Sequence, residues 1–567
     1  MKFENFLSRT KDIAWPAAIA LLGIIFFSYS FSVASFFLGI GMTKSVFPLS
    51  LIAGIATGTA LDVKRDTVRS GALTVLVLLT VMACILIEGS LYDQSYDGIR
   101  YHQETIASIC DGWNPFDGAD GINAPESIWP LHYAKAIEIA EASIVCFTGK
   151  METGKAINLI MIVAVAIGVY AFLRKNPSRI FLKGNLPQQA WNRKKSLFTT
   201  LLIVGNPVVW SQWIVYYIDF YKYLYLLLVL LSFCLIASSE KCRRVQGYTA
   251  LTMTLVLAMG SKFNFFFEAG LWMILAFVRL LWKKDYADLR RLIIVSAVSL
   301  GIGTLLAYHP YITNAIGYGH PLYPLMGEGS ADIMSGNTPE VFEGNGRIVN
   351  FFKSLFTISV PIYDQRAGGF TILMPFILLI SAIIAWRLRH SIRSVIWYVA
   401  ICTLLSCFIF EQTWWARYIC QLWLVGAIFL VASQCVEHTR KARVAISVFM
   451  AAACLTTMTA SIGISVIRGS YMHHLFETCR EKPVTVAGSF PRQMKRHLDE
   501  ERISYVVIDS VPENEKENAL NYYYECPPAI ILSKSQIESL DRRLKFFHQS
   551  TDRYRFHYSN KQENQDE

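Results

Sequence analysis

Ionisable and aromatic residues gather directly after a long apolar segment, in the stretch YDQSYDGIRYHQETIASICDGWNPF at 92–116. A well-placed carboxylate can take the proton of an attacking hydroxyl group, which is worth about 10²- to 10⁴-fold in rate. Asp97 and Tyr101 are four residues apart, so they would share one face of a helix. Asp93 lies about one turn earlier as a second candidate base, and His102 is a candidate for contact with the substrate.

Cationic side chains elsewhere could hold a lipid-linked phosphate. Lys262 lies in GSKFN between two apolar segments, Arg417 lies beside two tryptophans in WWARYICQLW, and Arg366 lies in DQRAGG. A planar guanidinium group is well suited to phosphate. Plainer interpretations stay open: Lys262 could extend to the membrane interface, and Arg417 could anchor an aromatic belt. Asp97 could cap a helix, and His102 could satisfy a local hydrogen bond.

The composition places these residues in a membrane protein. The chain has 567 residues, of which 53% are hydrophobic and 17% charged, whereas soluble domains have about 25% charged residues. Because about 20 apolar residues cross a bilayer, we predict an all-α polytopic protein with about 13 transmembrane helices. The predicted spans lie near residues 13–39, 46–61, 71–91, 154–173, 196–216, 222–239, 247–261, 263–282, 291–308, 369–386, 393–410, 415–434 and 443–467.

Lysine and arginine alternate between successive loops, which predicts a cytoplasmic N-terminus and three large segments outside the cytoplasm. These segments are 92–153, 309–368 and the polar tail 468–567. The net charge of +10 is explained by cytoplasmic anchoring, so nucleic acid is not an expected partner. We divide the chain into an N-terminal transmembrane hairpin (1–70), a transmembrane catalytic region (71–467) and a small extracytoplasmic α/β domain formed by the tail.

Short patterns predict structure within these segments. In the tail, VTVAGS, SYVVIDS and AIILS are typical of short buried strands, and PRQMKRHLDEER and SQIESLDRRLKFF are typical of amphipathic helices. In the first outward loop, YDGIRYHQETIASI has helical spacing, and WPLHYAKAIEIAEASIVCF suggests a helix lying at the interface. RIVNFFKSLFTI in the second loop suggests an amphipathic surface helix. The spacing GIATG at 54–58 favours close helix packing.

The sequence offers one candidate disulfide and no clear metal site. Cys479 and Cys526 share the tail and could form a disulfide in an oxidising compartment, although their spacing decides nothing. No metal ligand set is predicted, because no His/Cys spacing is diagnostic. The first outward loop is acidic, so a divalent metal is a possible addition.

Charged residues are nearly absent from the middles of the predicted spans and gather at their outer ends. A transporter would more often carry ionisable residues at the membrane midplane. A site with apolar helices below and polar loops above suits a substrate that is half lipid and half polar.

Three motifs in order resemble bacterial glycosyltransferases of the GT-C superfamily, in the mannosyltransferase-like and aminoarabinose-transferase-like group. They are DGIRYH followed by GWNPF, GYGHPLYPL (317–325) and WWARYICQLW (414–423), and the resemblance covers about residues 71–435. It implies that an Asp of the first outward loop is the base and that the donor is a polyprenyl-phosphate sugar. Two departures stand out: this loop follows the third apolar segment instead of the first, and His320 occupies the usual Asn position.

We therefore expect a membrane glycosyltransferase in the bacterial inner membrane that inverts the sugar carbon and has Asp97 as its base. Its acceptor would be an extracytoplasmic glycan, lipid or protein. An O-antigen polymerase or ligase is the alternative enzyme, and a transporter or flippase is the alternative outside enzymes. The sequence names neither the sugar nor the acceptor.

Overall fold

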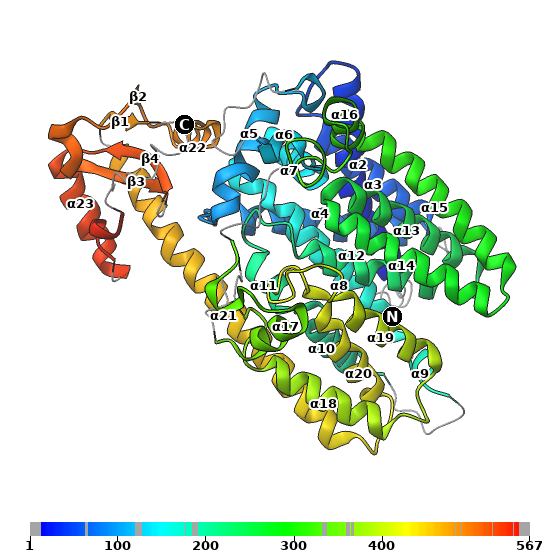
Figure 1. Ribbon diagram of the computed structural model, residues 1–567. Coiled ribbons are helices and arrows are strands. Elements are labelled where there is room, and N and C mark those ends of the chain that lie inside the picture. Colours follow the sequence, from blue (N-terminus) through cyan, green and yellow to red (C-terminus); the bar gives the residue numbers. More distant parts are fainter. Residues whose placement is uncertain are drawn as a thin grey trace.

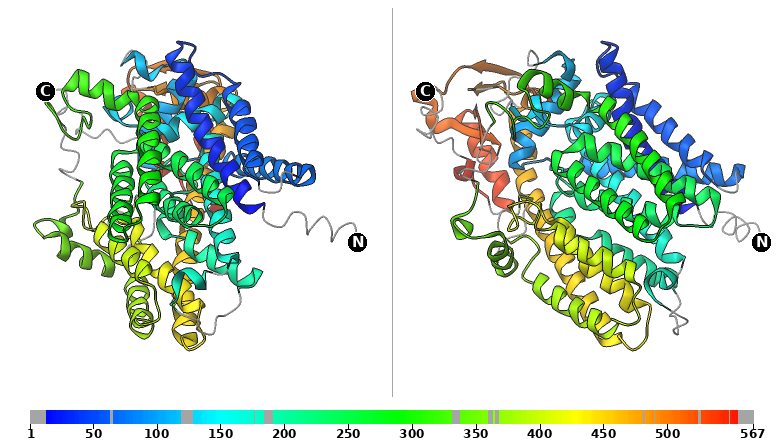
Figure 2. Two further views of the ribbon diagram at one scale, coloured as in Figure 1. Left: turned by 90° about the vertical axis from the view of Figure 1, so that its right-hand side faces the viewer. Right: turned by 45° about the vertical axis from the view of Figure 1, so that its right-hand side comes forward.

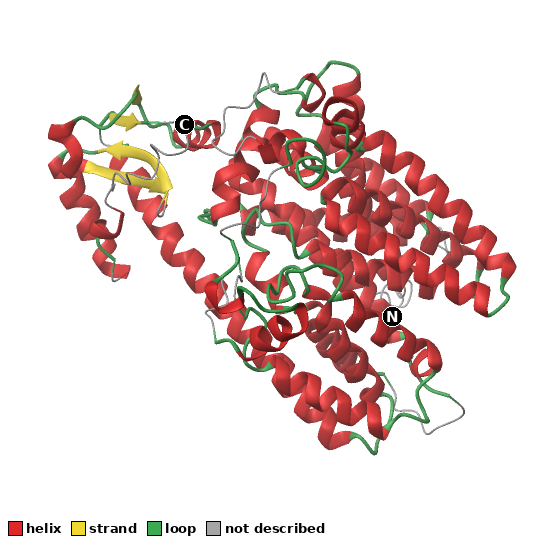
Figure 3. Cartoon of the chain, in the orientation of Figure 1, coloured by secondary structure: helices red, strands yellow, loops and turns green. Residues whose placement is uncertain are grey.

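The computed structural model describes residues 13–62, 66–118, 128–175, 177–183, 191–330, 337–358, 363–364, 368–480, 482–488, 490–523, 526–547 and 549–554. Helices make up most of this range, and strands gather in the tail (Figures 1 and 3). The first helices are α2 (Ala14–Phe37), α3 (Val46–Ala60), α4 (Thr67–Glu88), α5 (Gln103–Cys110), α6 (Ile128–His132), α7 (Ala136–Thr148), α8 (Ala156–Arg174) and α9 (Ser178–Phe181).

The central helices are α10 (Arg193–Val204), α11 (Pro207–Gln212), α12 (Tyr221–Ile236), α13 (Lys241–Ser261), α14 (Phe263–Trp282), α15 (Tyr286–Leu306) and α16 (Tyr308–Tyr318). They are followed by α17 (Arg347–Phe356), α18 (Met374–Arg387), α19 (Ser394–Ser406), α20 (Trp423–Gln434) and α21 (Arg440–Cys479). Figure 2 shows these helices packed into one broad bundle, with the tail at one end.

Six helices in the described residues are long and apolar enough to cross a membrane: α2, α4, Met151–Arg174, α14, α15 and α21. Helix α4 has an apolar surface that is unfavourable in water: the side chains of Val75, Leu79, Met82 and Leu86 are each more than half exposed. Exposed apolar surface of this kind marks contact with lipid or protein. The helices fit a polytopic membrane protein, and the number of crossings stays a prediction.

Close packing of α2 on α3 depends on two glycines, as the GIATG spacing predicted. A Cβ atom on Gly54 would lie 2.7 Å from the carbonyl oxygen of Ala20, and one on Gly58 would lie 2.6 Å from that of Pro16. Only the missing side chains let the two backbones approach this closely.

Two predicted spans differ from the structure in a way that matters for the site. The span 196–216 is two short helices, α10 and α11, because the backbone leaves the helix at Gly205 and restarts at Pro207. The span 415–434 begins five residues late, with a 3₁₀ turn at Cys420–Leu422, so Arg417 lies in a loop. The hairpin between α13 and α14 is confirmed, with Lys262 alone in extended conformation at its tip.

The first outward loop is helical, as expected, but one helix lies in an unexpected place. Residues 98–102 form a π-helical turn that continues into α5. Helix α7 was predicted at the interface; instead every residue from 134 to 145 is buried, because α2, α5 and the turn Met151–Lys155 cover it. The amphipathic helix of the second loop is confirmed as α17, with Ile348 and Phe352 exposed.

The tail contains a four-stranded sheet of β1 (Val484–Ala487), β2 (Tyr505–Ile508), β3 (Ala519–Tyr523) and β4 (Cys526–Ile531), with helices α22 (Arg492–Glu500) and α23 (Lys534–Leu544). The strand order is β2-β1-β4-β3, with β1 and β2 parallel and the other pairs antiparallel. Strand β3 was not predicted. Strand β2 is an edge with Val506 and Val507 exposed, so its predicted burial is wrong.

Helix α22 attaches the tail to the first outward loop. Gln493 donates from its side chain to the carbonyl oxygen of Ile99 at 2.9 Å, and its backbone N–H donates to Glu104 at 3.3 Å. Glu500 accepts from the backbone N–H of Met151 at 2.8 Å. The tail therefore contacts the same loop that carries the predicted base.

Candidate functional site

Two cations and three carboxylates form one connected cluster. Arg417 Nη1 lies 2.9 Å from Asp97 Oδ2 and 3.3 Å from Asp219 Oδ2. It lies 3.5 Å from Asp364 Oδ1. Lys262 Nζ donates to Asp219 Oδ1 at 2.6 Å. Asp219 thus joins the two cations, and Arg417 joins Asp219 to Asp97.

Each charged group comes from a break between helices. Asp97 immediately precedes the π-helical turn, and Lys262 is the tip of the α13–α14 hairpin. Asp219 lies in the non-helical connection between α11 and α12. That connection is closed by Gln212, whose side chain accepts from the backbone N–H of Phe220 at 3.0 Å. Backbone bends at the ends of apolar helices therefore place these charges together.

The loop that carries Arg417 is held in place by contacts from several sides. Lys222 Nζ donates to the carbonyl oxygen of Tyr418 at 2.7 Å, and the Trp415 indole donates to the carbonyl oxygen of Asp364 at 2.7 Å. The guanidinium carbon lies 4.3 Å from the Trp415 ring centre and 5.4 Å from that of Tyr217. Aromatic rings beside a guanidinium stabilise it by cation–π interaction, so this side chain is firmly oriented.

The cluster is charged in spite of its burial. Burial raises the pKa of Asp219, but Lys262 and Arg417 outweigh it and hold the pKa below its usual range. Burial lowers the pKa of Lys262, but Asp219 and Tyr418 together raise it above its usual range. The pKa of Arg417 is likewise lowered by burial and raised further by Asp219 and Asp97. Buried charges are tolerated when paired in this way.

A narrow cleft opens beside the cluster, lined by Tyr101, His102, Thr105, Trp129, Pro130, Tyr133, Ala134, Lys135, Glu138, Ile218 and Lys262. Its free volume of about 10 Å³ holds about one water molecule. His102 Nδ1 lies 2.8 Å from Glu138 Oε1, and this pair is nearly buried. Burial, and then the Asp97 carboxylate, raise the pKa of Tyr101. A ligand larger than a water molecule requires the walls of this cleft to separate.

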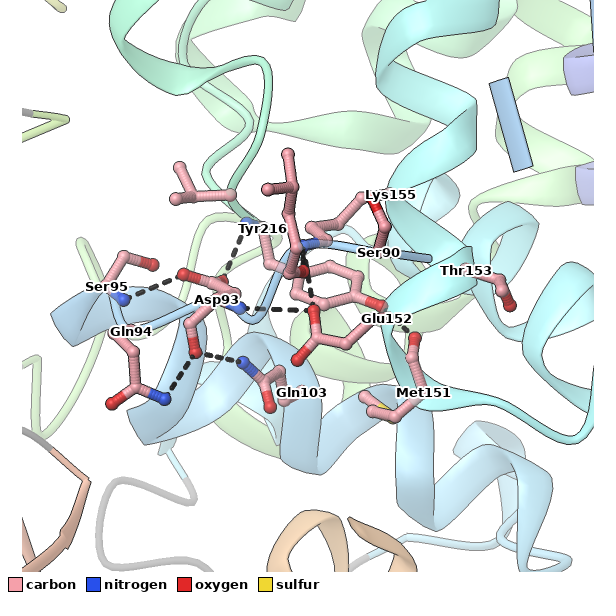
Figure 4. Close-up of polar contacts among 12 residues, drawn as sticks. Ser90, Asp93, Gln94, Ser95, Gln103, Met151, Glu152, Thr153, Lys155 and Tyr216 are labelled. Atoms are coloured by element: carbon pink, nitrogen blue, oxygen red, sulfur yellow. Dashed lines mark hydrogen bonds and ion pairs between the residues drawn. The ribbon is translucent and has the colours of Figure 1, made fainter. Parts of the chain in front are cut away.

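Asp93 lies in a different, fully buried cluster (Figure 4). Its carboxylate accepts from the backbone N–H of Ser95 at 2.7 Å and of Tyr216 at 2.9 Å. Its own backbone N–H donates to Glu152, which pairs with Lys155 at 2.8 Å. Burial raises the pKa of Asp93, with Lys155 opposing. Its contacts fix the shape of the loop beside Asp97, and its predicted role as a reserve base stays untested.

The two remaining motifs make structural contacts. Asn114 of GWNPF caps the short turn that follows by accepting from Phe116 N–H, and its amide donates to the carbonyl oxygen of Phe36. His320 accepts from the backbone N–H of Leu322 at 3.1 Å. The first contact attaches the outward loop to α2, and the second shapes a local turn.

The structure brings Asp97, Lys262 and Arg417 into one cluster, with Tyr101 and His102 on the adjoining cleft. Arg366 lies outside the described residues, as does the side chain of Cys526. Asp219, Asp364 and Glu138 were not predicted. For Asp219 a signal existed: it is the one acidic residue in the largely apolar stretch IVYYIDFYKY, where ionisable residues are expensive and often functional.

A possible divalent metal was predicted for the acidic outward loop. Within the described residues, the group of side chains suited to a metal ion is His473, His474 and Glu477 on α21. Glu477 there also pairs with Arg543 at 2.5 Å. The prediction for the outward loop stays untested.

No protein-family model and no curated protein matches this sequence. Among solved structures, the chain is similar to ArnT from Cupriavidus metallidurans, crystallised with undecaprenyl phosphate. The identity is 11%, the match covers 78% of this chain and 87% of that chain, and the TM-score is 0.47. At these values the likeness establishes no shared fold, so the function of this chain is inferred from its own residues.

Proposed function

We propose that this chain is a membrane glycosyltransferase that moves a sugar from a polyprenyl-phosphate donor to an extracytoplasmic acceptor. The observation that carries the proposal is the cluster of Asp97, Arg417, Asp219 and Lys262 at the ends of apolar helices. It combines a partly accessible carboxylate with two oriented cations, and in our proposal the ends of these helices lie at the depth of the lipid phosphates. We place the protein in the bacterial inner membrane, with its N-terminus cytoplasmic.

The three carboxylates differ in their access to a substrate. The side chains of Asp97 and Asp364 are 18% and 20% exposed, whereas that of Asp219 is 3% exposed. A donor phosphate that approaches Arg417 therefore meets Asp97 and Asp364 first, while Asp219 keeps both cations in place. Displacing Asp97 from Arg417 releases its carboxylate to accept a proton.

The proposed chemical step uses these positions. An acceptor hydroxyl attacks the anomeric carbon, its proton passes to Asp97, and the bond from that carbon to the phosphate oxygen breaks with inversion. The departing polyprenyl phosphate takes the bonding electrons as an anion. Arg417 and Lys262 stabilise that charge, and such oriented groups are often the largest contribution to catalysis. The leaving group is a stable anion, so the step requires no general acid.

Sugar transfer from a synthetic polyprenyl-phosphate sugar, measured with purified protein in liposomes, tests this proposal. We expect Asp97→Asn to lose about 10²- to 10⁴-fold in turnover. Asp364→Asn is the matched control, because it removes a carboxylate of similar exposure from the same arginine. Near-normal turnover of Asp97→Asn, or an equal loss in both variants, contradicts the assignment of Asp97 as the base.

A further inference from the structure

A second cationic site lies at the other end of α14. A groove with about 390 Å³ of free space is lined by Lys183, Arg279, Lys283, Arg393, Ser394 and Val395. Four of its six lining residues are cations, and no carboxylate lines it. None of the ion pairs found in the described part of the chain uses these four cations. The neighbouring segment 184–190, outside the described residues, has the sequence GNLPQQA without an acid.

Backbone contacts hold the cations together. An antiparallel bridge joins Leu182 to Ile392, and the backbone N–H of Lys183 donates to the carbonyl oxygen of Ser391 at 2.7 Å. Arg393 donates from its backbone N–H to Phe181 and from Nε to the carbonyl oxygen of Leu182. These bonds fix two cations that are far apart in sequence on one side of the groove.

The other side of the groove is the C-terminal end of α14. The Arg279 guanidinium carbon lies 5.5 Å from the ring centre of Tyr398 on α19, which orients it. Lys283 directly follows the last helical residue. Helix α19 begins at Ser394 without a side-chain cap, so its first N–H groups add partial positive charge at the groove. The groove is thus cationic on every side that the lining residues define.

The position of the groove relates it to the membrane. Helix α14 has 20 residues, about 30 Å at 1.5 Å per residue, which matches the hydrocarbon core of a bilayer. With Lys262 at one end, the groove lies one membrane thickness away. Trp282 and Trp386, at the same end, are 80% and 68% exposed, as interfacial tryptophans are. Helix α14 exposes the apolar residues Ile274, Val278 and Leu281 on the side opposite Arg279 and Lys283.

We propose that this groove binds the phosphate headgroup of an anionic phospholipid in the predicted cytoplasmic leaflet. A free phosphate offers the same chemistry, but the groove lies at the end of a helix long and apolar enough to cross a membrane, beside the exposed Trp282. Basic pockets between transmembrane helices on this side are suited to anionic headgroups. The proposal is independent of the transfer reaction.

The test measures binding of phosphatidylglycerol and phosphatidylcholine to the full-length protein in detergent, by native mass spectrometry. The variant Lys183→Gln with Lys283→Gln removes two charges whose side chains form no hydrogen bond or ion pair with the described residues. We expect its affinity for phosphatidylglycerol to fall about 10- to 30-fold, with that for phosphatidylcholine unchanged. Lys183→Arg with Lys283→Arg should keep binding, which excludes misfolding as the cause.

The matched control is Arg440→Gln with Lys441→Gln, which removes two exposed charges at the start of α21 on the same predicted face. An equal fall in this control would overturn the proposal in favour of diffuse surface charge. Unchanged binding in the Lys183 and Lys283 glutamine variant would overturn it too. Inorganic phosphate is the second probe: if it occupies the groove and phosphatidylglycerol does not, the site binds a soluble anion and the lipid assignment is wrong.

Discussion

Asp219→Asn should destabilise the fold more than most single substitutions at a polar residue. Asp219 is buried and pairs with both Lys262 and Arg417, at 2.6 and 3.3 Å. Removing one partner of a buried ion pair costs about 3–5 kcal/mol. Arg417 keeps Asp97 and Asp364, and the Lys262 side chain is 16% exposed and can reach water. We therefore expect a loss of about 2–3 kcal/mol in the free energy of unfolding.

Unfolding of the purified protein by SDS in mixed micelles, followed by circular dichroism, measures this loss. Adding Lys262→Met to Asp219→Asn removes the stranded cation, so the double variant should lose less than the sum of the single variants, with a coupling of about 1–2 kcal/mol. Asp288→Asn is the control, because its pair with Arg291 is exposed and worth about 0–1 kcal/mol. If Asp219→Asn costs no more than this control, the cluster is not held together by Asp219.

Two further predictions concern the outward loop. A Cβ atom on Gly98 would lie 2.2 Å from Asp93 Oδ2, so Gly98→Ala should lower the free energy of unfolding by about 1–3 kcal/mol. It should also reduce sugar transfer, although it removes no charge. A variant as stable as the wild type would contradict this packing. Burial raises the pKa of Glu104 and Glu500 to about 7, and Glu152 raises that of His497 against its burial. The folded state therefore favours the protonated forms of Glu104, Glu500 and His497. The attachment of α22 to the outward loop should become stronger as the pH falls from 8 to 6. Hydrogen exchange of α22 measures this, and faster exchange at pH 6, after correction for the intrinsic rate, would contradict it.

Local patterns predicted much of the helical structure, because apolar segments and their breaks are set by neighbouring residues. The hairpin at Lys262 and the GIATG packing were both found in this way. The burial of α7 was missed, since it depends on which helices cover it. Asp219 was missed for a similar reason: its partner Arg417 is 198 residues away, and no local pattern records that pairing.

Asp97 and Arg417 were each predicted as site residues, and the structure places their side chains 2.9 Å apart. Asp364 lies in an irregular loop, where the spacing of residues in the sequence does not predict which way a side chain points. The edge position of β2 in the tail sheet also escaped prediction, since Val506 and Val507 are typical of buried strands although both are exposed. Such outcomes are decided by strand order, which is a property of the whole domain.

The length of helix α21 determines how far the tail domain lies along the helix axis and how that domain is rotated about the axis. It has 40 residues without a break, about 60 Å in length, roughly twice the hydrocarbon thickness of a bilayer. Its last turns, with Tyr471 and Phe476, belong to the core of the tail domain. Each inserted residue would raise that domain by about 1.5 Å and rotate it by about 100°, turning α22 away from the outward loop. A whole-turn insertion would restore the orientation but still raise the domain by about 5.4 Å, so functional homologues should keep the length of this helix.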